Sequence, residues 1–206
     1  MTLGIDGLRF GYDEGPVLDG IDLTVESGEL VGLLGPNGSG KSTLLQCCNR
    51  LLNPDDGCVV LENDRVGALD ATERARRFGY VPQAESRAFP ATVFETILQG
   101  RRPYGGWSPS RSDRAAVEAV IDRLNLDELA GRRVGDLSGG QRQKVHLGRA
   151  LVGDPSALLL DEPTSALDLK HRLEVMDLVV TDVRDRGLAG LVAIHDINLA
   201  ARYCDR

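Results

Sequence analysis

The sequence predicts an α/β fold with a mostly parallel sheet, an antiparallel β part at the N-terminus and a helical insert. Three apolar runs, residues 30–34, 157–160 and 191–194, are each long enough for a strand that is buried on both faces. A glycine-rich loop follows the first run, and apolar residues at helical spacing from Leu44 to Leu52 follow the loop. Because strands and helices alternate, we expect a parallel sheet with functional loops at one edge.

The glycine-rich loop, residues 35–43, reads Gly-Pro-Asn-Gly-Ser-Gly-Lys-Ser-Thr and predicts a site for nucleotide phosphates. Glycines let successive N–H groups point inward, and the N-terminus of the next helix adds partial positive charge. We expect Lys41 to reach the β- and γ-phosphates and the Ser42 hydroxyl to bind Mg²⁺. An ordinary glycine turn is the alternative, which the flanking strand and helix disfavour. The predicted phosphate-binding residues are Gly35, Pro36, Asn37, Gly38, Ser39, Gly40, Lys41, Ser42 and Thr43.

Two segments at the N-terminus, residues 3–10 and 21–25, alternate apolar and polar residues. This pattern predicts an antiparallel hairpin or small sheet with a turn over residues 11–16. Tyr12 lies in the predicted turn, where its ring either stacks on a nucleotide base or only fills the turn.

The middle of the chain predicts a helical insert that runs from residue 84 to about residue 150. Gln83 ends a predicted short strand just before it, where a plain loop residue is the simplest interpretation. We expect helices over residues 92–100 and 113–126 with a loop between them. Trp107 lies in that loop and either packs against the insert or offers a surface to a partner.

Ser138, Gly139, Gly140 and Gln141 open a further predicted helix. The N–H groups and partial positive charge of a helix N-terminus allow a second anion site there. An ordinary N-cap is the alternative, because serine is a favoured capping residue.

Polar side chains follow the second and third apolar runs at the edge where a parallel sheet binds ligands. Asp161 suits a Mg²⁺ shell, and Glu162 is placed to polarise a water for attack on the γ-phosphate. His195 follows the last run and is either a structural residue or a functional one. His146 and His171 lie on predicted helices, and we assign them no role.

Charge, apolar stretches and cysteine spacing limit the possible partners and location of the chain. The chain has 206 residues and a net charge of −7, which argues against nucleic acid as its main partner. No apolar stretch reaches the length needed to cross a bilayer and no signal peptide is evident, so we expect a cytosolic chain. The four cysteines show no C-x-x-C spacing, and we expect reduced core thiols.

These motifs occur in the order that ATP-binding-cassette (ABC) proteins show, and the chain resembles an ABC-transporter ATPase subunit along essentially its whole length. The resemblance implies a P-loop NTPase core over residues 1–83 and 151–206, with ATP and Mg²⁺ as ligands. Residues 84–150 are then a helical subdomain that carries the signature motif Leu-Ser-Gly-Gly-Gln. The matching positions are residues 35–43, Gln83, residues 137–141, residues 160–163, residues 165–168 and His195.

The resemblance also implies roles for residues around one ATP site. Tyr12 matches the aromatic that stacks on adenine, and Gln83 matches the glutamine that senses Mg²⁺ and the attacking water. Glu162 matches the catalytic base. His195 matches the switch residue that contacts the γ-phosphate.

A second set of residues implies a head-to-tail dimer with two shared ATP sites. Ser138 and Gly140 of the signature motif, together with Gly139 and Gln141, match residues that face the ATP of the opposite subunit. Asp168 matches the loop that crosses the interface between protomers.

Two stretches, residues 100–104 and 195–205, resemble the subfamily that energises uptake of iron–siderophore complexes, haem and cobalamin. The implied partners are permease subunits at the cytoplasmic face of the membrane and, indirectly, a substrate-binding protein. A soluble ABC ATPase, an importer for another solute and a binding module without hydrolysis are the alternatives. Because family members usually continue well past the switch histidine, we expect that the C-terminal end of the family domain is missing after Arg206.

Overall fold

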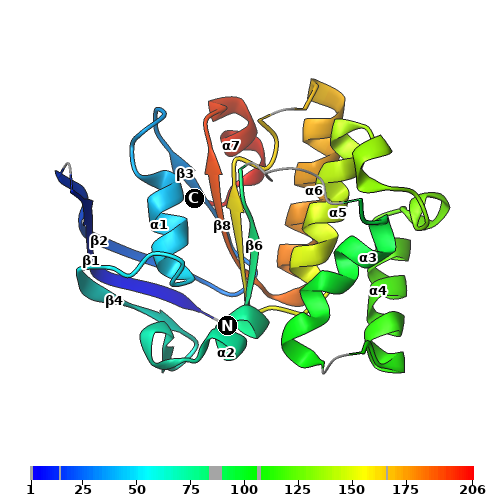
Figure 1. Ribbon diagram of the computed structural model, residues 1–206. Helices are drawn as coiled ribbons and strands as arrows, with labels where there is room; N and C mark the ends of the chain where they lie inside the picture. The colour runs from blue at the N-terminus through cyan, green and yellow to red at the C-terminus, as the bar shows by residue number, and fades with distance from the viewer. Residues whose placement is uncertain (1, 14, 84–89, 106–107, 166) are drawn as a thin grey trace.

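Two four-stranded sheets organise the structure (Figure 1). The computed structural model describes residues 2–13, 15–83, 90–105, 108–165 and 167–206. One sheet is antiparallel with the order β2-β1-β4-β5, and the other is parallel with the order β3-β8-β7-β6. The predicted α/β fold class is therefore confirmed.

The antiparallel sheet contains β1 (Leu3–Tyr12), β2 (Gly15–Val25), β4 (Asp56–Leu61) and β5 (Asp64–Arg65). It confirms the predicted N-terminal hairpin. Its turn is shorter than predicted, because Tyr12 is still in β1 and pairs with Gly15. The register shifts around Gly7, which has a φ of 56°, and this β-bulge keeps Leu8 on the buried face.

The parallel sheet contains β3 (Leu30–Leu34), β8 (Ala189–Ile194), β7 (Ala157–Asp161) and β6 (Phe78–Val81). Both faces of its central strands are covered. Leu158 and Leu160 pack into a cluster with the helices of one side, whereas Ala157 and Leu159 pack into a cluster with α1 and the antiparallel sheet. Burial on both faces explains why the sequence of β7 is apolar without alternation.

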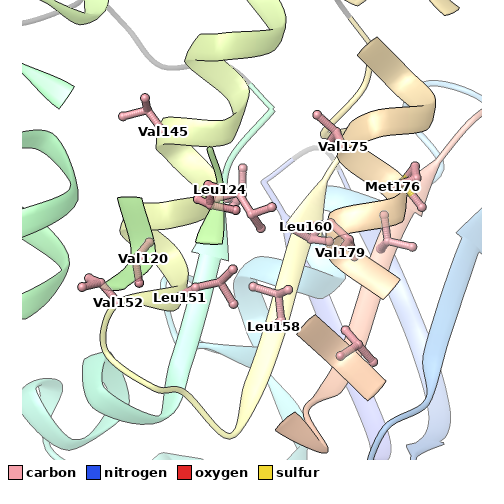
Figure 2. Close-up of a cluster of buried hydrophobic side chains, with 14 of the residues drawn as sticks. Val120, Leu124, Val145, Leu151, Val152, Leu158, Leu160, Val175, Met176 and Val179 are labelled. Atoms are coloured by element: carbon pink, nitrogen blue, oxygen red, sulfur yellow. The ribbon is translucent and has the colours of Figure 1, made fainter. Parts of the chain in front are cut away.

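Seven α-helices complete the described structure (Figure 1). Helix α1 lies between the two sheets, whereas α5 and α6 cover the other face of the parallel sheet and α3 and α4 pack against α5. Figure 2 shows the cluster on the helix-covered face of the parallel sheet, in which side chains of α4, α5, α6 and β7 meet. The helices are α1 (Lys41–Cys48), α2 (Ala71–Arg77), α3 (Val93–Leu98), α4 (Arg111–Arg123), α5 (Gly139–Leu151), α6 (Leu169–Arg186) and α7 (Ile197–Tyr203).

Several predicted helix boundaries were wrong. Helix α1 ends at Cys48, so Leu51 lies outside it and is 62% exposed. Part of the predicted loop after residue 100 is a 3₁₀ helix, Gln99–Tyr104, that continues from α3. Further 3₁₀ turns span Val66–Ala68, Asp127–Leu129 and Val134–Asp136.

Three other predictions have different outcomes. Trp107 lies outside the described residues. The cysteines are free thiols, with Cys47 and Cys48 buried and Cys58 and Cys204 partly exposed. Within the described ranges, no helix combines the length and the apolar character that a membrane span requires.

A largely buried ion pair joins the 3₁₀ helix after α3 to the start of α4. Arg101 Nε donates to Asp113 Oδ1 at 2.9 Å, and the Asp113 side chain is only 6% exposed. Asp113 also accepts hydrogen bonds from the side chain and the amide of Ser110, which caps α4. These hydrogen bonds hold the pKa of Asp113 at about 2, below its usual 3.8. The Ser110 hydroxyl has the largest effect, followed by the Ser110 amide and Arg101.

We expect Asp113→Asn to destabilise the fold at neutral pH by removing the charge that these donors stabilise. Because the folded-state pKa lies below the ordinary value, this contribution is present above about pH 4 and is lost as the pH falls toward about 2. Urea unfolding at pH 7, 5, 4 and 3 would measure the difference between wild type and variant. Asp122→Asn, an exposed position on the same helix, is the control. A difference that does not shrink below pH 4 would contradict the assignment.

Candidate functional site

The phosphate loop connects β3 to α1, as its sequence position requires. Gly40 is the N-cap of α1 and has a φ of 87°, a conformation that favours glycine. A Cβ at Gly40 would lie 3.1 Å from Val17 of β2, so the loop also passes close to the antiparallel sheet. The N–H groups of the loop and of the first turn of α1 therefore lie close together at the N-terminus of the helix. Such a cluster of N–H groups suits an anion.

Lys41 lies across the loop that precedes it. Its Nζ donates to the carbonyl oxygens of Gly35 at 2.8 Å and Pro36 at 2.9 Å, and the residue is only 9% exposed. The ammonium group is thus held next to the loop by backbone acceptors. It remains a compact positive charge beside the amides that can bind phosphate.

Ser42 and Asp161 bring two oxygen ligands together at the same sheet edge. Ser42 Oγ donates to Asp161 Oδ1 at 2.8 Å. Burial raises the pKa of Asp161, while the hydrogen bond from Ser42 opposes the shift. No group of three or more acidic, histidine or cysteine ligands occurs in the parts of the chain described. This donor set suits Mg²⁺, which takes few protein oxygens and keeps waters and substrate phosphates as its other ligands.

Glu162 is the centre of a second group of polar side chains. Its Oε2 accepts a hydrogen bond from Gln83 Nε2 at 3.0 Å and lies 3.6 Å from His195 Nδ1. The backbone of Glu162 has a φ of 47°, and its amide donates to the carbonyl of Ala193 in β8. The chain therefore turns sharply as it leaves β7, and the carboxylate contacts side chains that follow β6 and β8.

Ser42, Gln83 and Glu162 line one cavity of about 440 Å³. Asp161 and His195 do not line it themselves, and each contacts it through a lining residue, Ser42 and Glu162 respectively. Tyr12 lies at its side, 52% exposed, with its ring edge-on to Phe10 at a centroid distance of 4.9 Å and an angle of 87°. One flat face of Tyr12 can therefore take a planar ligand. Sequence reasoning missed Val17, which no motif indicates. The lining residues are Tyr12, Val17, Asn37, Gly38, Ser39, Gly40, Lys41, Ser42, Thr43, Gln83 and Glu162.

The signature residues do not line this cavity. The Gln141 amide donates to Ser138 Oγ at 3.3 Å, and Gln141 Oε1 accepts from the Ser138 amide at 3.1 Å, which forms a capping box at the start of α5. Ser138 and Gly139 are exposed, whereas Gly140 is buried. The N-cap interpretation is thus satisfied within one chain, and the exposed residues Ser138 and Gly139 remain available to another molecule.

Asp168 also lies outside the cavity and caps α6 through the amide of His171. His171 Nδ1 lies 2.8 Å from each carboxylate oxygen of Asp168. No motif indicates a role for this histidine, and its three-residue spacing from Asp168 is the signal that could have paired them.

Comparisons with known proteins agree with the motifs. The ABC transporter family model matches residues 18–165. An uncharacterized ABC transporter ATP-binding protein of Methanocaldococcus jannaschii is 44% identical over all of this chain and 81% of its own length. The cobalamin import ATP-binding protein of Halobacterium salinarum is 41% identical over all of this chain, which spans about half (52%) of that relative.

Other relatives and solved structures extend the likeness. Relatives 37–43% identical are named as import proteins for phosphonates in Alcaligenes faecalis and hemin in Pseudomonas entomophila, and for siderophore transport in Bacillus subtilis. A dimeric ATP-binding cassette bound to ADP and phosphate is 30% identical, with a TM-score of 0.85 over 98% of this chain and 91% of its own. The chain therefore belongs to the ABC transporter family, in which it is an ATP-binding subunit that hydrolyses ATP with Mg²⁺.

Proposed function

We propose that this chain energises the import of a metal chelate, namely an iron–siderophore complex, haem or cobalamin, through separate permease subunits. The observation that carries the enzymatic part is the group formed by Gln83, Glu162 and His195 beside the phosphate loop. A carboxylate that is fixed by an amide donor next to a phosphate cradle suits general-base assistance to a water.

In this proposal the charged and polar residues in and beside the cavity have separate tasks. Lys41 exchanges its backbone acceptors for phosphate oxygens, and Tyr12 stacks on the adenine. Glu162 orients the attacking water and takes its proton, and His195 contacts the γ-phosphate. Ser42, Asp161 and Gln83 would hold Mg²⁺, which supplies positive charge at the phosphates.

We propose that the signature residues contact ATP that is bound to a second protomer. Ser138, Gly139, Gly140 and Gln141 form a helix N-terminus outside their own cavity. Ser138 and Gly139 are exposed there, which suits a phosphate presented by another chain. Asp168 faces the same protomer boundary. ATP then becomes part of the interface between two copies, and its hydrolysis removes that contact.

A groove of about 490 Å³ supports docking of a permease. It lies between the end of α1, α2 and β6 on one side and the 3₁₀ helix 99–104 with α5 on the other. None of its described lining residues is acidic, so it suits an acidic permease segment. Gln83 follows β6, which lines the groove, and is hydrogen-bonded to Glu162. A shift of β6 on docking can therefore move the Glu162 carboxylate through this bond. The basic lining residues are Arg50, Arg74, Arg76, Arg102 and Arg149.

The same groove separates the two parts that the resemblance implies. We propose that residues 84–150 act as one helical subdomain on a core of residues 1–83 and 151–206. Docking at this boundary places the chain at the cytoplasmic face of a membrane through its permease. A substrate-binding protein then delivers the solute from the other side.

Relatives named for cobalamin, hemin and siderophore transport support the metal-chelate class, and an equally similar phosphonate relative supplies the competing solute. The test replaces the chromosomal gene by a Glu162→Gln version in the organism that carries it. We expect uptake of radiolabelled cobalamin, ferric siderophore or haem to be lost, while growth on phosphonate is unchanged. Loss of phosphonate use alone would contradict the metal-chelate class. If no uptake changes, although the purified wild-type chain hydrolyses ATP, the result would favour a soluble ABC ATPase.

A further inference from the structure

The first turns of α5 and α6 meet at the ring of His171. A Cβ placed on Gly140 of α5 would lie 2.8 Å from Cγ and 3.0 Å from Cβ of His171. No real Cβ is tolerated at the first of these distances, so only a glycine lets the ring lie this close to α5. The imidazole therefore packs directly against the backbone of the signature motif.

The other side of the ring is bonded to Asp168. His171 Nδ1 lies 2.8 Å from both carboxylate oxygens, and the His171 amide donates to Asp168 Oδ1 at 3.0 Å. Since a carboxylate only accepts hydrogen bonds, Nδ1 carries the proton and donates it. These bonds from the His171 amide and then its side chain lower the pKa of Asp168, which keeps the carboxylate charged.

A second contact joins the two helices further from their ends. Lys144 of α5 lies 3.4 Å from Glu174 of α6, and Lys170 lies 3.9 Å from the same carboxylate. These charged pairs do not include Gly140 or Asp168. The His171 side chain contacts both Gly140 and Asp168.

We infer that His171 is a positioning residue that holds the Gly140 backbone and the Asp168 side chain in one fixed arrangement. The two elements then meet the partner protomer and its ATP as a preformed surface, and less conformational freedom is lost on dimerisation. The inference rests on the proposed contact of the signature motif with ATP on the second protomer. His171 does not line the chain's own cavity, so its effect is confined to the dimer.

Three substitutions separate the two contacts of the ring. His171→Ala removes both, His171→Phe keeps a ring against Gly140 without the donor, and His171→Asn keeps a donor toward Asp168 without the ring. Lys170→Ala, one residue earlier and 81% exposed, is the matched control. All four are made in the Glu162→Gln chain, in which ATP is bound but not hydrolysed.

The experiment measures ATP affinity of the monomer by calorimetry at low protein concentration and the dimer dissociation constant by sedimentation with Mg-ATP. We expect His171→Ala to raise the dimer dissociation constant at least tenfold. His171→Phe and His171→Asn should each raise it by less, because each keeps one of the two contacts. Monomer affinity for ATP should stay within twofold, and the melting temperature should match that of Lys170→Ala. In the active chain, the protein concentration at half-maximal ATPase rate should rise by a similar factor.

The possible failures are distinguishable. If the Glu162→Gln chain itself stays monomeric with ATP, the proposed shared-site function fails. If that chain dimerises and His171→Ala dimerises as tightly as Lys170→Ala, the positioning role is wrong. Equal losses of monomer ATP affinity or of melting temperature in all three His171 variants would show a general structural role and would also overturn the inference.

Discussion

Replacement of Glu162 by glutamine should lower the turnover number for ATP about 10²- to 10⁴-fold, the usual contribution of a positioned general base. The amide keeps the size of the side chain and can still accept the hydrogen bond from Gln83, but it cannot take a proton from water. ATP binding should therefore persist, and the chain should accumulate as an ATP-bound dimer. Phosphate release at saturating Mg-ATP and sedimentation with ATP would measure both effects.

Glu128→Gln is a control for Glu162, because Glu128 is exposed on the 3₁₀ turn Asp127–Leu129. It should hydrolyse ATP at the wild-type rate. Hydrolysis by Glu162→Gln at the wild-type rate would exclude Glu162 as the base. His195, which lies 3.6 Å from the same carboxylate, would then be the next residue to replace.

The second large effect is expected for Lys41→Met, which removes the charge of the phosphate loop but keeps most of the aliphatic length. A hydrogen bond to a charged group contributes about 1.5–3 kcal/mol, so Mg-ATP should bind roughly 10- to 150-fold more weakly. Titration calorimetry with Mg-ATP would measure the loss. The melting temperature without nucleotide tests whether the released carbonyls of Gly35 and Pro36 matter for folding.

Lys170→Met is the matched control for Lys41, since Lys170 is highly exposed and does not line the cavity. It should bind Mg-ATP with wild-type affinity. Unchanged affinity in Lys41→Met would mean that the backbone amides alone hold the phosphates, and the role assigned to the lysine would have to be abandoned.

The strands of the parallel sheet and the phosphate loop could be predicted because their signals are local. Strand β7 is apolar and buried from Ala157 to Leu160, and the loop requires glycine where the backbone adopts a positive φ. The end of α1 was mispredicted, because Leu51 continues the helical spacing although it is exposed. The 3₁₀ helix Gln99–Tyr104 was missed because Arg101, within it, is fixed by distant Asp113.

The candidate site shows the same limit. Motifs indicated Lys41, Ser42 and Glu162, but the bond between Gln83 and Glu162 joins residues that are far apart in the chain. His171 carries no motif of its own that indicates Gly140 as its neighbour. The first contact depends on the pairing of β6 with β7, and the second depends on the packing of α5 against α6. Periodicity alone reveals neither.

The capping box at Ser138 has a consequence for which side chains can serve at that position. A serine hydroxyl has one proton and two lone pairs, and the cap on the Gln141 amide uses a lone pair. The proton stays free, so the same oxygen can begin the helix and donate to a phosphate oxygen at the same time. Aspartate would cap equally well but has no proton to give and would repel the anion. Threonine keeps both capacities and is the substitution that we expect the motif to tolerate.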